Sequence, residues 1–220
     1  EVTVLNQTPS SFNAIQSFLL EESADLQIRY LIFGGEALKP TILRNWVATL
    51  PGCKVINMYG ITETTVHVTY KQIGAKEIAS NESNIGTPIP TLGCVILDDN
   101  QEKVAHGVVG ELYVYGAGVA KGYLNREELT AQRFVSLNLD GNGERRYYRS
   151  GDLASLNIHG ELEYFGRKDT QVKIRGYRIE LGEIESKLEE LHAVTQSVVI
   201  ARDDAEGNKQ LIAYLKVNSE

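Results

Sequence analysis

The sequence predicts an α/β layer, then a β-rich subdomain, then the start of a small α+β domain. Three observations predict this order. Residues 1–60 alternate short apolar runs with helical periods, residues 93–166 carry short strands between turns, and a helix between two hairpins follows Gly166. Strands that alternate with helices favour a parallel sheet, whereas short strands bounded by turns favour an antiparallel sheet or barrel.

The α/β layer is expected over residues 1–92. Its short apolar runs predict strands, and its apolar residues at helical spacing predict helices: strands at 2–5, 30–35 and 54–57, helices at 10–20 and 39–50. Pro40 suits the first turn of the second helix, because the N–H that proline lacks would have no partner there. This alternation predicts parallel pairing of the strands.

The β-rich subdomain is expected over residues 93–168. Turns rich in Gly, Asp and Asn separate its apolar runs, which predict strands at 94–97, 110–116, 152–157 and 161–166. One helix, at 126–134, is expected among them. Strands this short and closely spaced are typical of a small antiparallel sheet or barrel.

A domain boundary is expected near Lys168 and Asp169, which divides the chain into residues 1–168 and 169–220. Both ends of the chain are strand-like, EVTVLN and LIAYLKV, and the sequence has no initial methionine. We therefore expect a piece of a longer protein, with a partial large domain followed by a partial small domain.

The second part predicts a hairpin, a helix and another hairpin. The first hairpin is QVKIRGYRIE, with Gly176 at its turn. The helix is expected in LGEIESKLEELH, with apolar residues on one face at Ile184, Leu188 and Leu191. The tail predicts strands at 197–204 and 209–217, joined by a Gly/Asn turn at 205–208.

Composition limits the classes of function. An apolar share of 42% is ordinary for a globular protein, and a net charge of -7 argues against a nucleic-acid partner held through its phosphates. Cys53 and Cys94 lack the spacings of a zinc site or a disulfide framework. No apolar run approaches the ~20 residues of a membrane span. We expect a cytoplasmic protein that binds neither nucleic acid nor membrane.

The segment NMYGITETT follows a predicted buried strand, and ligands of α/β sheets bind beyond the carboxyl ends of strands. Its candidate ligand-binding residues are Asn57, Tyr59, Gly60, Thr62 and Glu63. An aromatic face, hydroxyls and a carboxylate suit a purine, a phosphate and Mg²⁺, which prefers oxygen ligands. A plain Asn/Gly turn with a solvated Glu remains an equal alternative at this point.

Two further segments carry candidate residues. Asp152 follows a Gly turn in YRSGDL, where its carboxylate can accept hydrogen bonds from paired hydroxyls such as those of a ribose. Arg167 and Lys173 flank Asp169 in GRKDTQVKIRG, where cations can meet phosphate. Taken alone, a common turn Asp and a solvated basic strand explain these residues equally well or better.

In order along the chain, four segments resemble successive core motifs of the amino-acid adenylation domains of nonribosomal peptide synthetases. They are NMYGITE, GELYVYGAGVAKGYL, YRSGDL and GRKDTQVKIRGYRIELGEIE. The resemblance covers essentially the whole chain. It implies the C-terminal part of the large adenylate-forming domain followed by the start of the small C-terminal domain.

The resemblance also implies a reaction. An amino-acid carboxylate attacks the α-phosphate of ATP, giving aminoacyl-AMP and pyrophosphate, and the phosphopantetheine thiol of a partner carrier domain then takes the acyl group. Mg²⁺ and cations would stabilise the phosphoryl charge. The product class would be a nonribosomal peptide, such as an antibiotic.

Residue roles follow from position in these motifs. Tyr59 would stack on adenine, Asn57 would bond its edge, and Gly60 belongs to the same nucleotide-binding turn. Thr62 would contact phosphate, Glu63 would hold Mg²⁺, and Lys173 is a further catalytic candidate. Asp152 would bind the ribose hydroxyls and Arg167 ribose or phosphate. Asp169 matches the hinge about which the family's small domain rotates, and the hairpin around Gly176 would then approach the thiol channel.

The sequence also departs from the family pattern. The glycine-rich phosphate loop that precedes this region and the later Lys that bonds the adenylate carboxyl oxygen fall outside the 220 residues. The chain alone is therefore expected to be inactive without the rest of the adenylation domain. Ile61 replaces the usual Pro of YGPTE, which should change the turn and leave the ligand residues in place.

Six residues match positions that line the family's side-chain pocket: Asn6, Ile32, Gly34, Met58, Val66 and His67. This series resembles the pattern associated with L-threonine. Apolar side chains would narrow the pocket, and Asn6 and His67 could hydrogen-bond a substrate hydroxyl. The alternative is a set of ordinary core residues, with His67 a buried histidine that has its partners.

Two other functions stay open at this stage. The first is an acyl- or aryl-CoA ligase of the same superfamily, which shares the plan of the motifs. The second is a non-catalytic fragment that serves as a folded binding or scaffold piece.

Overall fold

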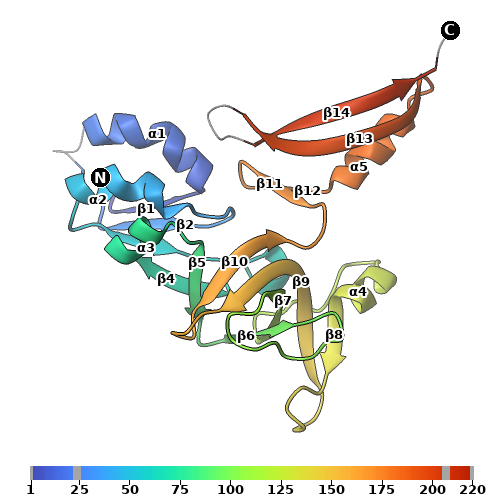
Figure 1. Ribbon diagram of the computed structural model, residues 1–220, viewed down its shortest axis with the longest axis horizontal. Helices are drawn as coiled ribbons and strands as arrows, with labels where there is room; N and C mark the ends of the chain where they lie inside the picture. The colour runs from blue at the N-terminus through green and yellow to red at the C-terminus, as the bar shows by residue number, and fades with distance from the viewer. Residues whose placement is uncertain (1, 22–25, 205–208, 219–220) are drawn as a thin grey trace. The chain divides into compact units, whose positions relative to one another are not determined.

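The computed structural model describes residues 2–21, 26–204 and 209–218. Two compact units, residues 1–168 and 169–220, follow one another along the chain (Figure 1). Within the described residues, every helix is too short or too polar to cross a bilayer.

The first unit is built on one ten-stranded sheet, in the order β1-β2-β3-β4-β5-β10-β9-β7-β6, with β8 paired to β9. The strands are β1 (Val4–Gln7), β2 (Tyr30–Phe33), β3 (Lys54–Asn57), β4 (Thr69–Ile73), β5 (Asn84–Pro88), β6 (Leu92–Leu97), β7 (Gly110–Gly116), β8 (Phe134–Leu137), β9 (Arg145–Leu156) and β10 (Leu162–Arg167). The pairs β1·β2 and β2·β3 are parallel, and the remaining pairs are antiparallel. The predicted mixture of an α/β layer with a β-rich part is confirmed.

Short helices cover the parallel strands. They are α1 (Pro9–Glu21), the 3₁₀ helix η2 (Pro40–Leu43), α2 (Arg44–Thr49) and α3 (Ala75–Ser80). Phe12 of α1 and Trp46 of α2 meet edge to face at 5.2 Å over a fully buried core. The single helix expected at 39–50 is instead a 3₁₀ turn followed by an α-helix. Pro40 does lie in its first turn, and 3₁₀ turns are common at helix N-termini.

The strand β5 joins the two halves of the sheet. It pairs with β4 on one side and with β10 on the other, so the α/β layer and the β-rich part share one hydrogen-bonded sheet. The sequence assigned no strand to this stretch.

The β-rich part is antiparallel, as predicted, and carries the inserted helix α4 (Glu127–Arg133). Phe134 was expected to end this helix and instead begins β8, which pairs with the first half of β9. Its ring packs on Tyr148 at 5.0 Å and is buried with Ile61, which explains why the chain becomes extended there.

The second unit contains the hairpin β11 (Val172–Ile174) and β12 (Tyr177–Ile179), then α5 (Leu181–Glu189), then β13 (Val194–Asp203) paired with β14 (Lys209–Val217). The hairpin predicted with Gly176 at its turn is present, and Arg175 and Gly176 both have positive φ, which suits a two-residue turn.

The expectation for Leu191 is wrong. The helix α5 ends at Glu189, and Leu191 lies beyond it and is 56% exposed, because the chain turns there toward β13. Leu181 is the buried residue of this helix. The turn predicted at 205–208 lies outside the described residues.

Candidate functional site

A bulge in β9 directs the Asp152 side chain into the first unit. Between the pairs Glu111↔Leu153 and Tyr113↔Arg149, β9 has two more residues than β7, and Gly151 within this bulge has φ 74°. The Ser150 hydroxyl spans the bulge, since it donates to Leu112 O at 2.6 Å and accepts from Asp152 N at 3.0 Å. The YRSGDL segment therefore builds a fixed position for one carboxylate.

Three side chains meet this carboxylate, which is fully buried. Tyr59 donates its hydroxyl to Asp152 Oδ2 at 2.5 Å, and Tyr164 donates to Oδ1 at 3.4 Å. Arg167 donates from Nη1 to Oδ1 at 3.2 Å and to Ser150 O at 2.8 Å. Burial raises the pKa of the Tyr59 phenol, and the neighbouring Asp152 raises this pKa further, so the phenol remains a donor at neutral pH.

Residues predicted from three separate motifs thus share one cluster. Asn57 is also buried, and its Nδ2 donates to Asn84 O at 2.9 Å. The predicted ribose-binding and adenine-binding groups are therefore paired with one another or with the chain. A ribose hydroxyl that reached Asp152 would have to share or replace the phenol hydrogen bonds.

Tyr164 was missed in the sequence. Its ring lies 6.0 Å from that of Tyr59, at an interplanar angle of 37°. It falls two residues after the buried Leu162, and alternate residues of a strand share a face. This spacing is the signal that could have identified it.

Glu63 lies in a 3₁₀ turn, η3 (Thr62–Thr64), and is only 7% exposed, whereas Thr62 is exposed. Tyr123 donates its hydroxyl to Glu63 Oε1 at 2.6 Å. Burial and the nearby Glu63 raise the pKa of Tyr123, so its hydroxyl stays protonated.

The turn η3 carries Glu63, the predicted Mg²⁺ ligand. Within the described parts of the chain, no group of three or more His, Cys, Asp or Glu side chains could hold a metal. One fixed carboxylate still fits Mg²⁺, because this ion takes most of its other ligands from water and substrate phosphates.

The substrate-pocket residues lie close together. Asn6 and Ile32 are register partners on β1 and β2. A Cβ added to Gly34 would lie 3.4 Å from Met58 O and 3.6 Å from His67 Cε1. Burial lowers the pKa of His67 below 6.5, which favours the neutral imidazole.

Val66 occupies a strained turn beside His67. Thr65 and Val66 have φ 61° and 69°, values that β-branched residues rarely adopt. Gly60 permits this turn, since a Cβ there would lie 1.8 Å from Val66 O and 2.8 Å from His67 Cα. Val66 is 62% exposed, so the alternative interpretation, an ordinary core residue, is wrong for this position.

Lys173 and Asp169 belong to the second unit. Lys173 pairs in register with Arg178 across the β11–β12 hairpin. Asp169 accepts a hydrogen bond from Gln171 N at 3.2 Å and is the first residue of the unit.

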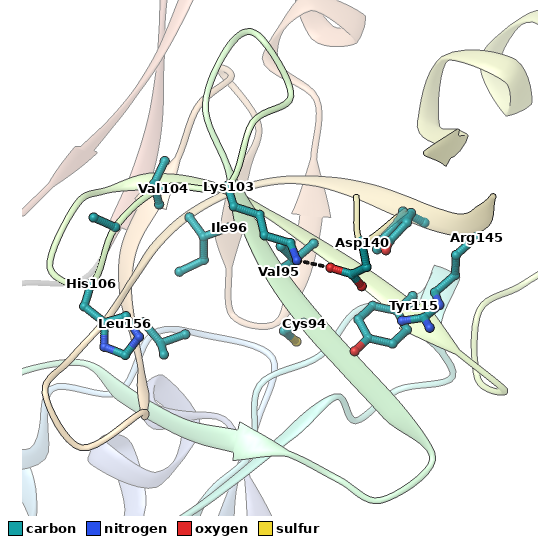
Figure 2. Close-up of a pocket in the computed structure, with 12 residues that line it drawn as sticks. Cys94, Val95, Ile96, Lys103, Val104, His106, Tyr115, Asp140, Arg145 and Leu156 are labelled. Carbon is teal, nitrogen blue, oxygen red and sulfur yellow. Dashed lines mark hydrogen bonds and ion pairs between the residues drawn. The ribbon is translucent and has the colours of Figure 1, made fainter. Parts of the chain in front are cut away.

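A surface pocket of about 230 Å³ lies on the β-rich part, and its lining contains none of the predicted site residues (Figure 2). It is lined by Cys94, Val95, Ile96, Lys103, Val104, Ala105, His106, Tyr115, Asp140, Arg145, Tyr147 and Leu156. Lys103 and Asp140 form an ion pair there. Burial raises the pKa of the Cys94 thiol to about 12, so the thiol is protonated and a poor nucleophile.

Comparison with known proteins gives consistent matches. Residues 1–124 match the model of the family described as AMP-binding enzyme. Malpinin synthetase of Mortierella alpina is 49% identical over 98% of this chain and 3% of its own length. The dimodular nonribosomal peptide synthase of Bacillus subtilis (strain 168) is 47% identical over all of this chain and 9% of its own length. The chain spans 8%, 3% and 9% of the first three curated relatives that it matches.

Solved structures also match over nearly the whole chain. Holo-PA1221, a nonribosomal peptide synthetase protein containing adenylation and PCP domains and bound to a vinylsulfonamide inhibitor, has a TM-score of 0.90 at 28% identity. The match covers 99% of this chain and 37% of that one. Holo-AB3403, a four-domain nonribosomal peptide synthetase bound to AMP and glycine, has a TM-score of 0.67 at 34% identity, over 100% of this chain and 16% of its own.

Proposed function

Because the chain belongs to the AMP-binding enzyme family and resembles the adenylation segments of nonribosomal peptide synthetases, we propose that it helps to activate an amino acid with ATP. The carboxylate of the amino acid would attack the α-phosphate of ATP, forming aminoacyl-AMP and releasing pyrophosphate. The complete enzyme would then load the amino acid onto the phosphopantetheine thiol of a carrier domain. These steps would take place in the cytoplasm.

The observation that best supports this proposal is the cluster around Asp152. Tyr59 and Arg167, from two motif segments, both donate hydrogen bonds to the buried carboxylate of Asp152, which belongs to a third. A carboxylate is a good acceptor for two ribose hydroxyls, and an aromatic ring offers a face to adenine. In the proposed complex the ribose hydroxyls take over part of the hydrogen bonding that Tyr59 and Tyr164 provide.

The phosphate side would use the neighbouring turn. Thr62 is exposed and offers a hydroxyl to a phosphate oxygen, while Arg167 and Lys173 offer positive charge. Glu63 would hold Mg²⁺, with Gly60 permitting the turn that carries it. Bound Mg²⁺ would neutralise phosphate charge.

We propose L-threonine as the amino acid. Ile32, Met58 and Val66 would form the apolar walls, Gly34 would leave room for the side chain, and Asn6 and His67 would meet the hydroxyl. The close approach of Gly34 to the His67 ring supports a shared pocket. The neutral state of His67 supports it too, because a neutral imidazole has both a donor and an acceptor nitrogen.

Asp169 would be the hinge of the second unit. It begins that unit, and a few residues at a junction usually absorb the change in backbone angles during domain rotation. The hairpin that carries Gly176 would then serve the thioester-forming step, with the carrier domain and the rest of the adenylation domain as partners.

Trapping of the acyl product tests the proposal. The complete protein that contains this chain is incubated with ATP, Mg²⁺, hydroxylamine and a panel of amino, aryl and fatty acids, and the hydroxamates are identified by mass spectrometry. Amino-acid hydroxamates are expected. Aryl or fatty hydroxamates would indicate the CoA-ligase alternative. No hydroxamate above a no-ATP control would indicate the non-catalytic alternative, in which the chain is a folded binding or scaffold piece.

A further inference from the structure

Tyr123 is placed by contacts on three sides. Its backbone N–H donates to Thr130 Oγ1 at 2.9 Å, which ties it to α4. Its ring packs edge to face on Phe134, with centroids 5.5 Å apart. Its hydroxyl lies 3.3 Å from that of Tyr148. These contacts fix the phenol in one position.

The residues just before Tyr123 are joined to the η3 turn, which carries Glu63, by two further hydrogen bonds. Ala120 N donates to Glu63 O at 2.8 Å, and the Thr65 hydroxyl donates to Gly118 O at 2.8 Å. Hydrogen bonds therefore connect the GAGVAKGYL segment to the η3 turn, although Tyr123 and Glu63 lie 60 residues apart in sequence.

The Tyr123 hydroxyl adds a further hydrogen bond between the two segments, since it donates to Glu63 Oε1 at 2.6 Å. The Glu63 side chain is long and has several rotamers, and a carboxylate fixed by a hydrogen bond needs less ordering when it binds a cation. Outer hydrogen bonds to ligating carboxylates commonly change metal affinity by ~10–100-fold when removed.

We propose that Tyr123 is a positioning residue for the reaction, which holds the Glu63 carboxylate in the orientation that binds the Mg²⁺ of Mg·ATP. This inference rests on the proposed function in one respect, the role of Glu63 as the metal ligand. Tyr123 would act through Glu63, with no contact of its own to metal or substrate.

The test compares three variants of the complete enzyme. Tyr123→Phe removes the hydroxyl and keeps the ring. Tyr115→Phe is the matched control, since Tyr115 lies on β7 with its ring against Tyr147 at 5.3 Å and outside this cluster. Glu63→Gln tests the metal role separately. The readouts are the Mg²⁺ concentration for half-maximal pyrophosphate exchange and the Kd for ATP, measured by calorimetry with and without Mg²⁺.

Tyr123→Phe is expected to raise the half-maximal Mg²⁺ concentration by ~10-fold or more. Its Kd for ATP should rise in the presence of Mg²⁺ and stay within about twofold in its absence, and added Mg²⁺ should restore exchange. Tyr115→Phe should change neither quantity. A merely structural role would lower activity at every Mg²⁺ concentration.

Three results would overturn the inference, and they differ in what they imply for the proposed function. If Glu63→Gln raises the Mg²⁺ requirement and Tyr123→Phe does not, or if added Mg²⁺ fails to restore Tyr123→Phe, the positioning role is wrong and the proposed function stands. If Glu63→Gln leaves the Mg²⁺ requirement unchanged, the assignment of Glu63 is itself wrong, and the inference falls with it.

Discussion

Replacing Gly60 with alanine tests the close packing of the Gly60 backbone against Val66 and His67. The new Cβ would lie 1.8 Å from Val66 O and 2.8 Å from His67 Cα, whereas ordinary contacts begin at 3.4 Å. The obstacle is backbone, which cannot rotate away as a side chain does. Overpacking typically costs about 1–3 kcal/mol, and we expect the upper end of that range. With a urea m-value near 2 kcal/mol/M, typical of a small domain, a loss of about 3 kcal/mol lowers the unfolding midpoint by roughly 1.5 M.

Urea unfolding measures this loss through the fluorescence of Trp46, the only tryptophan of the chain, which is buried in the core of the same unit. Gly52→Ala is the matched control, because a Cβ at Gly52 meets nothing within 4 Å. Its free energy of unfolding should stay within about 0.5 kcal/mol of the parent's. Equal midpoints for the two variants would refute the packing argument.

Four further predictions concern the proposed site. Asp152→Ala leaves the buried Arg167 without its carboxylate, so unfolding should become easier by about 3–5 kcal/mol, and ATP binding should weaken by roughly 1–3 kcal/mol. Denaturation and calorimetry measure the two effects, and an unchanged Kd would contradict the ribose role. Asp169→Pro restricts the proposed hinge and should reduce thioester formation more than adenylation; equal losses in the two half-reactions would contradict the hinge. His67→Ala should reduce the preference for threonine over valine more than the preference for threonine over serine, because it removes a polar partner and leaves the apolar wall. Competition assays measure both preferences, and an unchanged threonine-to-valine ratio would contradict the pocket assignment. Since the folded-state pKa of His67 lies below 6.5, the unfolded chain binds the proton more readily, and the free energy of unfolding should fall as pH drops from 7 through 6.5 toward that lower pKa. In His67→Ala this part of the pH dependence should vanish, and a pH profile identical to the parent's would show that His67 does not cause it.

The fold was most predictable where local patterns are strong. Lys54–Asn57 forms the expected strand because its consecutive apolar residues Val55 and Ile56 suit a buried strand. The turn at Gly176 follows from its local turn chemistry. The strand β5 was missed, because its role depends on pairing with β10, whose residues lie more than 70 positions further along the chain. Local patterns carry little information about such pairing.

The candidate site was likewise predictable where local motifs are strong, and not where it depends on contacts between distant residues. The motif positions identified Asp152 and Tyr59, but their contact at 2.5 Å depends on the bulge in β9 that Ser150 and Gly151 create. A bulge adds residues to one strand and so shifts its register. The alternation of apolar and polar residues in the sequence does not reveal this shift. Tyr123 was likewise part of a motif and had no role until the structure placed its hydroxyl on Glu63.

Amino-acid-dependent exchange of labelled pyrophosphate into ATP by the complete protein tests the central claim most directly. We expect exchange that requires Mg²⁺, is highest with L-threonine and is strongly reduced in Asp152→Ala. Serine should be the chief competitor, because it differs from threonine by one methyl group. Exchange that is independent of added amino acid, or that Asp152→Ala leaves intact, would contradict the assignment of this chain to amino-acid activation at the Asp152 cluster.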